Sequence, residues 1–400
     1  MTQYTVEKLG HRGDGLIRSA DATWAIPKIL PGEIVEINHG RLQQIITPSP
    51  DRISAFCKHY ESCGGCKFQH WRAEPYAGWK RGLLLEALKT RNIKTEVDAL
   101  VDAHGNGRRR VTLHVREQQG KWQAGFMEPK SHDLCAIDDC PVMVPALGNS
   151  STIAAAFGPN LGACDVSVTA ADNGLDVAIK AERKIVLRRL GAMNDIVRNH
   201  GILRLSVNGE THTSLADPMV TMGKASVTLP LQSFLQATQL GEATLGALVC
   251  ENLTKSKSVA DLFCGLGSFT FRLAEKTKVT AIDADRFAIK CLDAAARTTQ
   301  SLKPITAQAR DLFRAPLIAT ELREFDAVVF DPPRAGAEAQ AQQLAKSTVK
   351  RVVAIACDIG NFTRDAAILI AGGYKLRRVT PVDQFKWTAH LEMVGVFERS

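Results

Sequence analysis

The sequence has few aromatic residues and no segment suited to crossing a membrane or directing secretion. Phe, Trp and Tyr make up 6% of its 400 residues, so any ligand contact through an aromatic ring would rely on isolated side chains such as Phe385 or Trp387. The lack of a secretory signal or long apolar run favours a cytoplasmic protein with no membrane partner and with reduced cysteines. Internal repeats and low-complexity tracts are also missing, which argues against a solenoid or a disordered chain.

The sequence does contain ample hydrophobic material and an excess of positive charge. A hydrophobic content of 45% over this length fits two or three domains. The formal net charge of +8 suits a polyanionic partner. Basic residues cluster beside two expected strands, at Arg108 to Arg110 and around residues 185–187, at Arg183-Lys184 and Arg188-Arg189. Such clusters either track phosphates or protect a solvated strand edge, and the sequence leaves both interpretations open.

Two expected strands end on chemically reactive side chains. The apolar run Ala327–Phe330 leads into Asp331-Pro332-Pro333-Arg334, and the run at residues 352–356 ends on Cys357. Ligands of open α/β sheets bind at the carboxyl ends of the strands. A carboxylate and a thiol delivered to that edge predict the active site of an enzyme.

A glycine-containing turn upstream indicates a nucleotide site at the same edge. Gly265 and Gly267 follow a strand and precede a helical run, so the backbone can approach a ligand there. The next strand ends on Asp283, at about the 20-residue offset expected of a ribose-binding acid. Another strand end supplies Asp311, on the adenine side. The pattern predicts a doubly wound α/β sheet with an adenosine ligand across its edge.

Four motifs follow one another in the second half of the chain: the run from Asp261 to Thr270, Asp331-Pro332-Pro333-Arg334, Cys357, and His390-Leu391-Glu392. Together they resemble the RNA 5-methyluridine methyltransferase family, and the likeness extends back to the N-terminus. The resemblance implies S-adenosylmethionine as cofactor and a class I methyltransferase (Rossmann-like) domain, preceded by an OB-like β-barrel and a β-rich central domain. It assigns to the cofactor Gln236, Asp261, Phe263, Gly265, Gly267, Asp283, Asp311 and Asp331.

Some positions depart from the family pattern. Ser268 stands where asparagine is usual, and Asp283 stands where glutamate is usual. After the cysteine, Asp358-Ile359 replaces the usual Asn-Pro. Asp283 preserves the carboxylate for the cofactor, whereas the altered loop leaves the handling of the target base open.

The chemistry of uracil explains these residue types. Carbon 5 is a poor nucleophile, so a thiolate must first add to carbon 6 and turn the ring into an enolate. Cys357 is the candidate thiolate. A base must then remove the proton on carbon 5, and Glu392 is the candidate for that role. The resemblance further implies that Asp331 holds the pyrimidine edge and that Arg334 stabilises the enolate or a phosphate.

A base in folded RNA must be single-stranded or flipped out to be attacked, so RNA-gripping modules are expected. Residues 1–50 alternate short apolar runs with turns, as in a small antiparallel barrel. Barrels of the OB type commonly bind nucleic acids. The segment resembles the TRAM module of the family, and a plain β-domain is the alternative.

A cysteine cluster follows this module. Cys57, Cys63 and Cys66 lie close together, with two glycines that let the backbone curl around an ion or cluster. With a fourth thiolate they could hold zinc or an iron-sulfur cluster, and the spacing does not choose between them. The resemblance favours a [4Fe-4S] cluster with Cys140 as the fourth ligand, and Cys135 is the competing candidate.

These landmarks divide the chain into five segments. We expect a TRAM/OB-like barrel at 1–50, the cysteine segment at 51–68, a helical segment packed on the catalytic domain at 69–100, a β-rich central domain at 101–230, and the methyltransferase domain at 231–400.

The favoured function is methylation of carbon 5 of a uridine in RNA, by a monomer. The cysteine cluster favours 23S rRNA, because the resemblance associates it with the bacterial large-subunit enzymes. Transfer RNA as substrate, methylation of cytosine at carbon 5, and a non-catalytic iron-sulfur RNA-binding protein remain as alternatives.

Overall fold

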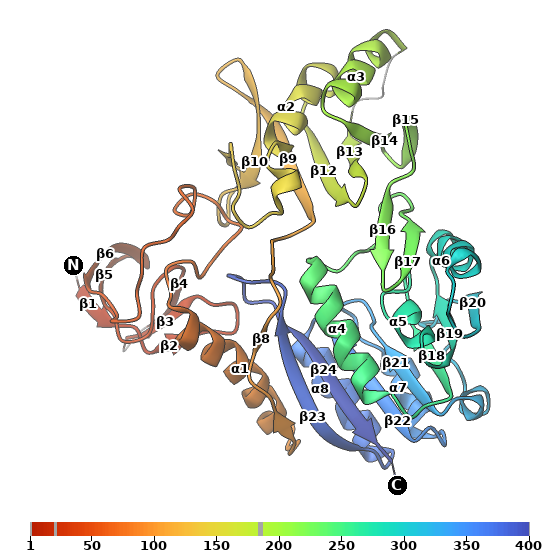
Figure 1. Cartoon of the computed structure of the whole chain (residues 1–400). Coiled ribbons are helices and arrows are strands. Elements are labelled where there is room, and N and C mark those ends of the chain that lie inside the picture. Colours follow the sequence, from red (N-terminus) through yellow and green to blue (C-terminus); the bar gives the residue numbers. More distant parts are fainter. Residues whose placement is uncertain (1, 20–21, 183–186, 400) are drawn as a thin grey trace.

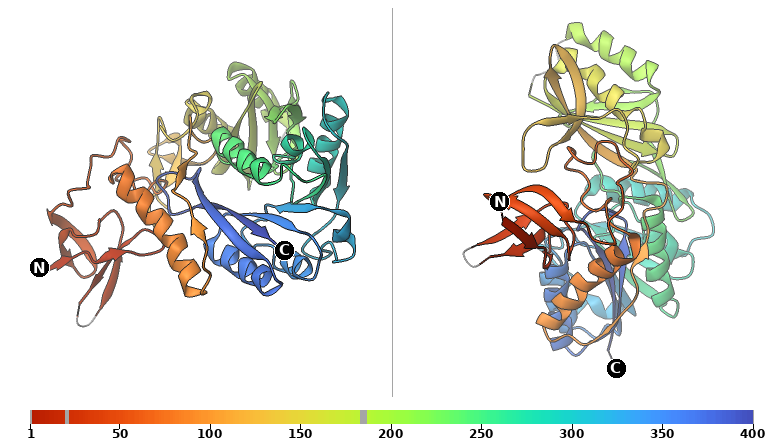
Figure 2. Two further views of the ribbon diagram at one scale, coloured as in Figure 1. Left: turned by 60° about the horizontal axis from the view of Figure 1, so that its bottom comes forward. Right: turned by 90° about the vertical axis from the view of Figure 1, so that its left-hand side faces the viewer.

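The computed structural model describes residues 2–19, 22–182 and 187–399. A pair of small N-terminal sheets lies to one side, a β-rich central domain lies at the top, and a large mixed sheet with helices on both faces lies below them (Figure 1). Two further views show the same three regions from below and from the N-terminal side (Figure 2).

The N-terminal region consists of two antiparallel sheets around one apolar core. The first sheet has the order β1 (Thr2–Thr5), β5 (Ile34–Asn38) and β6 (Arg41–Thr47). The second has the order β2 (Lys8–Leu9), β3 (Gly15–Arg18) and β4 (Thr23–Ile26). Alternate residues of both sheets, including Ile17, Ile26, Val35 and Ile37, point into the shared core. This period of two is what pleated strands with one buried face require.

The cysteine segment leads into one long helix, α1 (Ala73–Thr90). Its buried stripe has the i, i+4 spacing of one helix face and consists of Tyr76, Lys80, Leu84 and Leu88. α1 contacts α8 (Ile359–Ala371) of the large sheet. The chain then adds β7 (Glu96–Val97) and β8 (Val101–Asp102) to that sheet, both parallel to β23 (Lys375–Asp383).

The central domain contains one sheet with two helices packed on it. Its strand order is β11 (Leu134–Ala136), β10 (Lys121–Met127), β9 (Arg110–Gln118), β12 (Cys164–Ala171), β13 (Gly174–Ala181), β14 (Ile202–Val207) and β15 (Glu210–Ser214). The helices are α2 (Ser150–Leu161) and α3 (Leu187–Asn199), and η1 (Pro145–Leu147) is a short 3-10 turn. A hairpin of β16 (Met219–Met222) and β17 (Ala225–Thr228) leads down to the large sheet (Figure 1).

The large sheet is doubly wound, as predicted. Its order is β20 (Ile305–Ala309), β19 (Lys278–Asp283), β18 (Ser258–Leu262), β21 (Ala327–Phe330), β22 (Arg351–Ala356), β24 (Glu392–Glu398), β23 and β7. The strands from β20 to β22 are parallel, whereas β24 is antiparallel to both of its neighbours. The connecting helices are α4 (Gln239–Asn252), α5 (Thr270–Ala274), α6 (Arg286–Thr298), α7 (Glu338–Ala345) and α8, with the 3-10 turn η2 (Glu321–Glu324).

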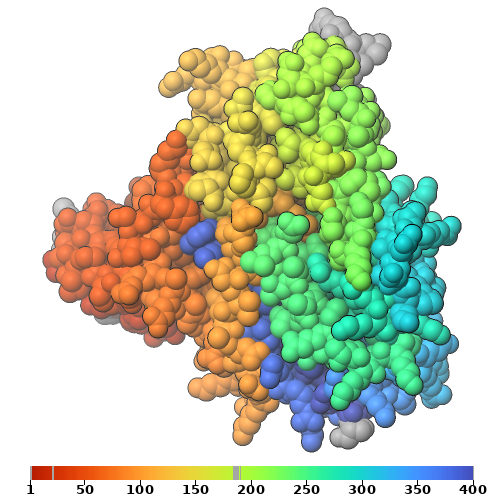
Figure 3. Space-filling view, in the orientation of Figure 1, coloured from red at the N-terminus to blue at the C-terminus, as the bar shows by residue number. Residues whose placement is uncertain are grey.

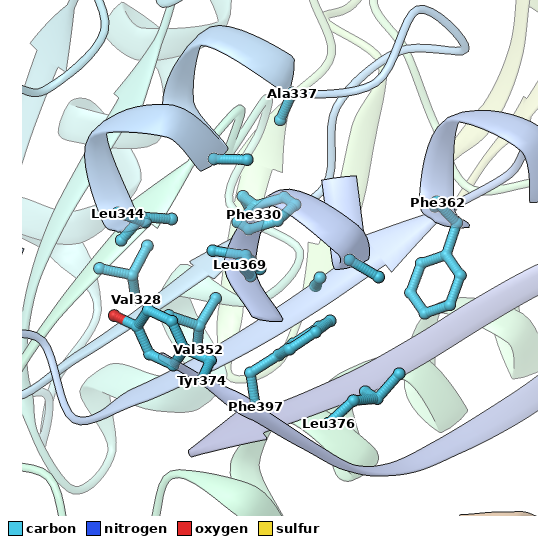
Figure 4. Packing of buried hydrophobic residues seen from close by; sticks show 14 of the residues in the cluster. Val328, Phe330, Ala337, Leu344, Val352, Phe362, Leu369, Tyr374, Leu376 and Phe397 are labelled. Atoms are coloured by element: carbon cyan, nitrogen blue, oxygen red, sulfur yellow. The ribbon is translucent and has the colours of Figure 1, made fainter. Parts of the chain in front are cut away.

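The central strands are apolar on both faces because helices cover both. Val328, Phe330 and Val352 pack toward α7 and α8, where Leu344 and Leu369 meet them (Figure 4). Their sequence neighbours Val329 and Val353 belong to the cluster on the opposite face, with Leu245 and Val249 of α4. Continuous apolar runs of this kind are expected of parallel strands buried on both sides. The polar side chains of these strands are therefore confined to their ends.

Candidate active site

Three neighbouring strands deliver their terminal residues to one edge of the large sheet. Asp261 lies near the end of β18, Asp331 directly follows β21, and Cys357 directly follows β22. The antiparallel strand β24 begins with Glu392 at the same edge. Its register pairs Met393 with Ala356, so Cys357 and Glu392 are the next residues outward on two adjacent strands. The sheet thus brings the predicted nucleophile and the predicted base together.

The thiol of Cys357 is partly buried beside acidic groups. Burial is the main cause that raises its pKa to about 11, followed by the charges of Glu392 and Asp331, whereas Arg334 opposes the rise. Asp358 is the N-cap of α8, since its side chain accepts a hydrogen bond from the Asn361 amide at 2.9 Å. The unusual residue after the cysteine therefore serves to start the helix that follows the thiol.

An amide chain connects the two carboxyl groups of the site. Gln236 Nε2 donates to Asp331 Oδ2 at 2.8 Å. Gln384 Nε2 donates to Gln236 Oε1 at 2.7 Å and to Glu392 Oε1 at 3.2 Å. Gln384 is fully buried and was not among the residues predicted for the site. Its position between Gln236 and Glu392, which are far apart in sequence, becomes visible only in the fold.

Burial raises the pKa of both carboxyl groups. The pKa of Asp331 rises to about 7, and its hydrogen bond from Gln236 opposes the rise. The pKa of Glu392 rises well above its ordinary value, first by burial and then by the charge of Asp331. Glu392 Oε2 is buried and has no hydrogen-bond partner among the described residues. A buried oxygen without a partner is costly, so this oxygen is able to accept a hydrogen bond from a bound substrate or solvent group.

A second unpaired oxygen lies at the glycine turn. Asp261 is fully buried, and its Oδ2 accepts from Thr270 Oγ1 at 2.5 Å, while its Oδ1 has no partner among the described residues. Burial is the main cause that raises its pKa to about 7. Gly265, with φ of +53°, has open space where a side chain would begin. At Gly267, with φ of +92°, a Cβ would lie 2.8 Å from the Phe271 ring.

The remaining predicted cofactor residues surround this turn. Asp283 Oδ2 accepts from the Gly265 amide at 2.9 Å and therefore fixes the turn. Phe263 adopts the left-handed region, with φ of +60°, and its ring lies 5.4 Å from that of Phe313. Asp311 caps the turn that carries Phe313, by accepting from the amide of that residue at 3.0 Å. The exposed Phe313 thus extends an aromatic surface from the glycine turn toward Asp311.

Arg334 is exposed, and its positive charge lies close enough to oppose the rise in the pKa values of Cys357 and Glu392. Its carbonyl accepts from Asn361 Nδ2 at 2.5 Å, which holds the loop after β21 against the start of α8. Its guanidinium group has no hydrogen-bond or ion-pair partner within the described part of the chain and is available at the rim of the site for an anionic group.

The arginine cluster at Arg108 to Arg110 faces inward rather than toward solvent. The buried Arg109 donates to the Gln236 carbonyl at 2.9 Å and to Glu242 at 3.2 Å. Arg110 donates to Thr169 Oγ1 at 2.9 Å. Both interpretations of this cluster, binding of phosphates and protection of a solvated strand edge, are therefore wrong for Arg109 and Arg110. Arg109 instead holds the backbone of Gln236 through its carbonyl. The second basic cluster lies partly outside the described part of the chain, which leaves out residues 183–186. The strand predicted at 185–187 is wrong for its last residue, because Leu187 is the first residue of helix α3.

Four of the predicted metal ligands line one cavity of about 280 Å³: Cys57, Cys63, Cys66 and Cys140. Arg108 also lines it. Cys135 is instead buried in the apolar core of the central domain. Within the described residues, no group of three or more His, Cys, Asp or Glu side chains has the arrangement of a metal-ion site. The thiols are therefore gathered around a common space without being drawn together on a single point.

The described residues include no helix that is both long and apolar enough to span a bilayer.

Residues 230–400 match the family model of the tRNA (uracil-5-)-methyltransferases. An RNA methyltransferase of Brucella suis is 42% identical over 99% of this chain and 98% of its own length. The 23S rRNA (uracil(1939)-C(5))-methyltransferase of Halomonas elongata is 30% identical, over 99% of this chain and 89% of its own.

A solved structure shares the fold over nearly the whole molecule. It is the tRNA (uracil-54, C5)-methyltransferase of Pyrococcus abyssi in complex with S-adenosyl-L-homocysteine, at 20% identity, with a TM-score of 0.77 and coverage of 99% of both chains. These matches agree with the family that the sequence motifs resemble. The chain therefore belongs to the RNA (uracil-5-)-methyltransferase family and is an enzyme of that class.

Proposed function

We propose that the protein transfers a methyl group from S-adenosylmethionine to carbon 5 of a uridine in RNA through a covalent bond between Cys357 and carbon 6. The observation that carries this proposal is the register of β22 and β24, which sets Cys357 beside Glu392. A thiol and a buried carboxyl at one edge, next to a glycine turn with an unpaired acid, are what the two steps need.

The side chains of the site divide the reaction between them. Cys357 loses its proton to solvent and adds as the thiolate to carbon 6, the C5–C6 double bond becomes the enolate, and Arg334 stabilises the enolate or a flanking phosphate. After methyl transfer, Glu392 removes the proton on carbon 5, and the thiolate leaves. The raised pKa of Glu392 makes its ionised form a stronger base than a solvated carboxylate. Asp331, already paired with Gln236, holds the pyrimidine edge.

S-adenosylmethionine supplies an electrophilic methyl group on a positively charged sulfur. The residues that would hold it are those grouped around the glycine turn and the amide chain: Gln236, Asp261, Phe263, Gly265, Gly267, Asp283, Asp311 and Asp331. The fit rests on the unpaired Asp261 Oδ1, the open space at Gly265 and the ring pair of Phe263 and Phe313. In their ionised forms, the carboxyl groups of Asp261 and Asp331 also favour a cationic ligand.

We further propose that Cys57, Cys63, Cys66 and Cys140 hold a [4Fe-4S] cluster. All four line one cavity of about 280 Å³. Thiolate ligands spread around a common space suit a cluster that binds each of them at a different corner. Cys140 is preferred over Cys135 because Cys140 lines the cavity with the other three cysteines, whereas Cys135 is buried within the adjoining apolar core.

The proposed substrate is 23S rRNA. Its support is the Halomonas relative, which acts on that RNA and matches 99% of this chain. The N-terminal sheets would act as a TRAM-type RNA-binding module, since they form a separate small β-unit with its own core. We expect a cytoplasmic monomer.

The test is methyl transfer by the purified protein from labelled S-adenosylmethionine to RNA of cells that lack it. Separate reactions receive 23S rRNA and transfer RNA, and mass spectrometry identifies the product base. We expect 5-methyluridine in 23S rRNA. Label in transfer RNA alone would contradict 23S rRNA as the substrate and indicate transfer RNA. Formation of 5-methylcytidine, or of no methylated pyrimidine, would contradict the proposed reaction.

A further inference from the structure

The loop at residues 384–391 connects β23 to β24 and ends directly before Glu392. It reaches the surface between the N-terminal region and the central domain, where the space-filling view shows blue atoms at this place (Figure 3). Trp387, in its middle, has φ of +61°, a left-handed conformation that L-residues other than glycine adopt at a cost. Such a residue persists only where its surroundings fix it, and it often marks a functional constraint.

Lys80 of α1 reaches this loop from the helix side. It occupies a position in the buried stripe where leucine would suffice for packing, and its side chain has no exposed surface. Its Nζ donates to Asp383 Oδ1 at 2.6 Å and to the His390 carbonyl at 2.6 Å. A longer contact of 3.4 Å joins it to the Phe385 carbonyl. One ammonium group therefore ties together both ends of the loop.

Tyr76, one helical turn earlier, fixes the strained residue itself. Its hydroxyl donates to Asp383 Oδ2 at 2.8 Å and accepts from the Trp387 amide at 2.9 Å. The Trp387 carbonyl accepts from the Lys67 amide at 2.8 Å. Both peptide groups of Trp387 are thus held by elements more than 300 positions away in the sequence.

A buried ion pair of this kind is weak evidence for stability, because desolvation of the charges offsets much of their attraction and apolar replacements are often tolerated. Its geometry here points to another purpose. The carbonyl of His390 lies two residues before Glu392, and the loop also carries Gln384, which donates to Glu392. Lys80 and Tyr76 therefore hold the loop on both sides of the residues that lead to Glu392.

We propose that Lys80 and Tyr76 are positioning residues, which hold the loop at 384–391 through Asp383 and thereby place Glu392 against carbon 5 of the bound uridine. This inference rests on the proposed role of Glu392 as the base. In that step Glu392 takes the proton from carbon 5, the electron pair of that C–H bond becomes the C5–C6 double bond, and the C6–S bond breaks to release the Cys357 thiolate. A displaced carboxylate slows this step alone and leaves the protein joined to methylated RNA.

The test compares three variants of the full chain. Lys80→Met removes the ammonium group but keeps the apolar stem, and Tyr76→Phe removes a single oxygen. Lys89→Met is the matched control, because Lys89 is exposed on the last turn of the same helix. Each variant is assayed for turnover, for the dissociation constant of S-adenosylmethionine, for covalent complex with ordinary uridine RNA, and for amide exchange in the loop.

For Lys80→Met and Tyr76→Phe we expect turnover to fall about 10- to 100-fold, the scale of a misplacement near 1 Å. The cofactor dissociation constant should stay within about twofold, the covalent complex should accumulate, and exchange at residues 384–391 should accelerate. Lys89→Met should behave as the parent protein. Tyr76→Phe keeps the proposal testable if Lys80→Met fails to fold.

Two results would overturn the inference. In one, exchange in the loop and turnover stay unchanged in both variants. In the other, turnover and cofactor affinity fall together without a covalent complex, which would indicate general destabilisation. If the parent protein methylates no uridine, the proposed function fails instead, and amide exchange in the loop still decides whether Lys80 and Tyr76 hold it.

Discussion

Two regions of the molecule carry thiols with proposed roles, and the two regions differ in the groups that surround the sulfur atoms. At the carboxyl edge of the large sheet, Cys357 stands alone among carboxyl groups, and Glu392 and Asp331 add to the burial that raises its pKa. In the cysteine cavity, burial raises the pKa of Cys66 to about 12, Cys140 and Cys63 add to the rise, and Gln69 and Arg108 oppose it. Burial is common to both, so the two kinds of site differ in the groups that neighbour the thiols: carboxyl groups beside the proposed nucleophile, and other thiols in the proposed ligand set.

The largest expected effect tests the first region. Cys357→Ala should abolish turnover, because removing a catalytic nucleophile costs on the order of 10⁶-fold. Cys250→Ala, which removes a partly buried thiol near the far end of α4, should leave turnover within about twofold. The measurement is methyl incorporation into RNA. Full activity of the Cys357 variant would remove the distinction between the two kinds of thiol.

Glu392→Gln should reduce turnover by about 10² to 10⁴-fold, the range for loss of a general base. The amide preserves the shape of the side chain and its contact with Gln384, so the thiol can still add and the methyl group can still transfer. The variant should therefore remain attached to uridine RNA, which a denaturing gel detects. Release of methylated RNA at the parent rate would show that another group removes the proton.

Substitutions of the cysteines in the cavity should change the iron content of the purified protein. Cys66→Ala and Cys140→Ala should lose iron and sulfide, whereas Cys135→Ala should retain both. Iron analysis and the visible absorbance of the purified variants provide the measurement. If Cys140→Ala retained the cluster and Cys135→Ala lost it, the fourth ligand would be Cys135 and not Cys140. Zinc in place of iron after anaerobic purification would contradict the cluster itself.

The smallest effect concerns pH. With a pKa of about 11, Cys357 in the free protein is almost entirely thiol near neutrality, and only the thiolate reacts with an alkylating agent. Its alkylation by iodoacetamide, followed on the peptide by mass spectrometry, should rise about tenfold per pH unit between 7 and 9. A plateau below pH 8 would mean that the carboxyl neighbours do not raise the pKa of this thiol.

The catalytic edge could be predicted from sequence because each of its residues is placed locally. Asp331 and Cys357 follow apolar runs, and parallel strands bring such ends to one edge. The glycine turn was visible for the same reason. By contrast, Lys80 and Asp383 lie 303 positions apart, and nothing around Lys80 in the sequence signals a buried ion pair.

The arginine cluster at Arg108 to Arg110 is a second case in which the local sequence does not predict a buried contact. Three consecutive arginines beside a strand are typical of a solvated or RNA-facing surface. Arg109 is buried because Glu242, 133 positions later, supplies its partner, and Gln236 supplies a carbonyl. Local patterns therefore predicted where the strands end and which side chains lie at that edge, whereas the buried polar contacts that hold those side chains depend on tertiary pairing.

The central claim is that Cys357 forms a covalent bond to the target base. RNA that carries 5-fluorouridine at the methylated position tests it most directly, because fluorine cannot be removed as a proton and the complex cannot resolve. With S-adenosylmethionine present, we predict a stable complex in which the nucleotide, one added methyl group and the peptide of Cys357 are found joined by mass spectrometry. A methylated product without any adduct, or an adduct on another cysteine, would contradict the account.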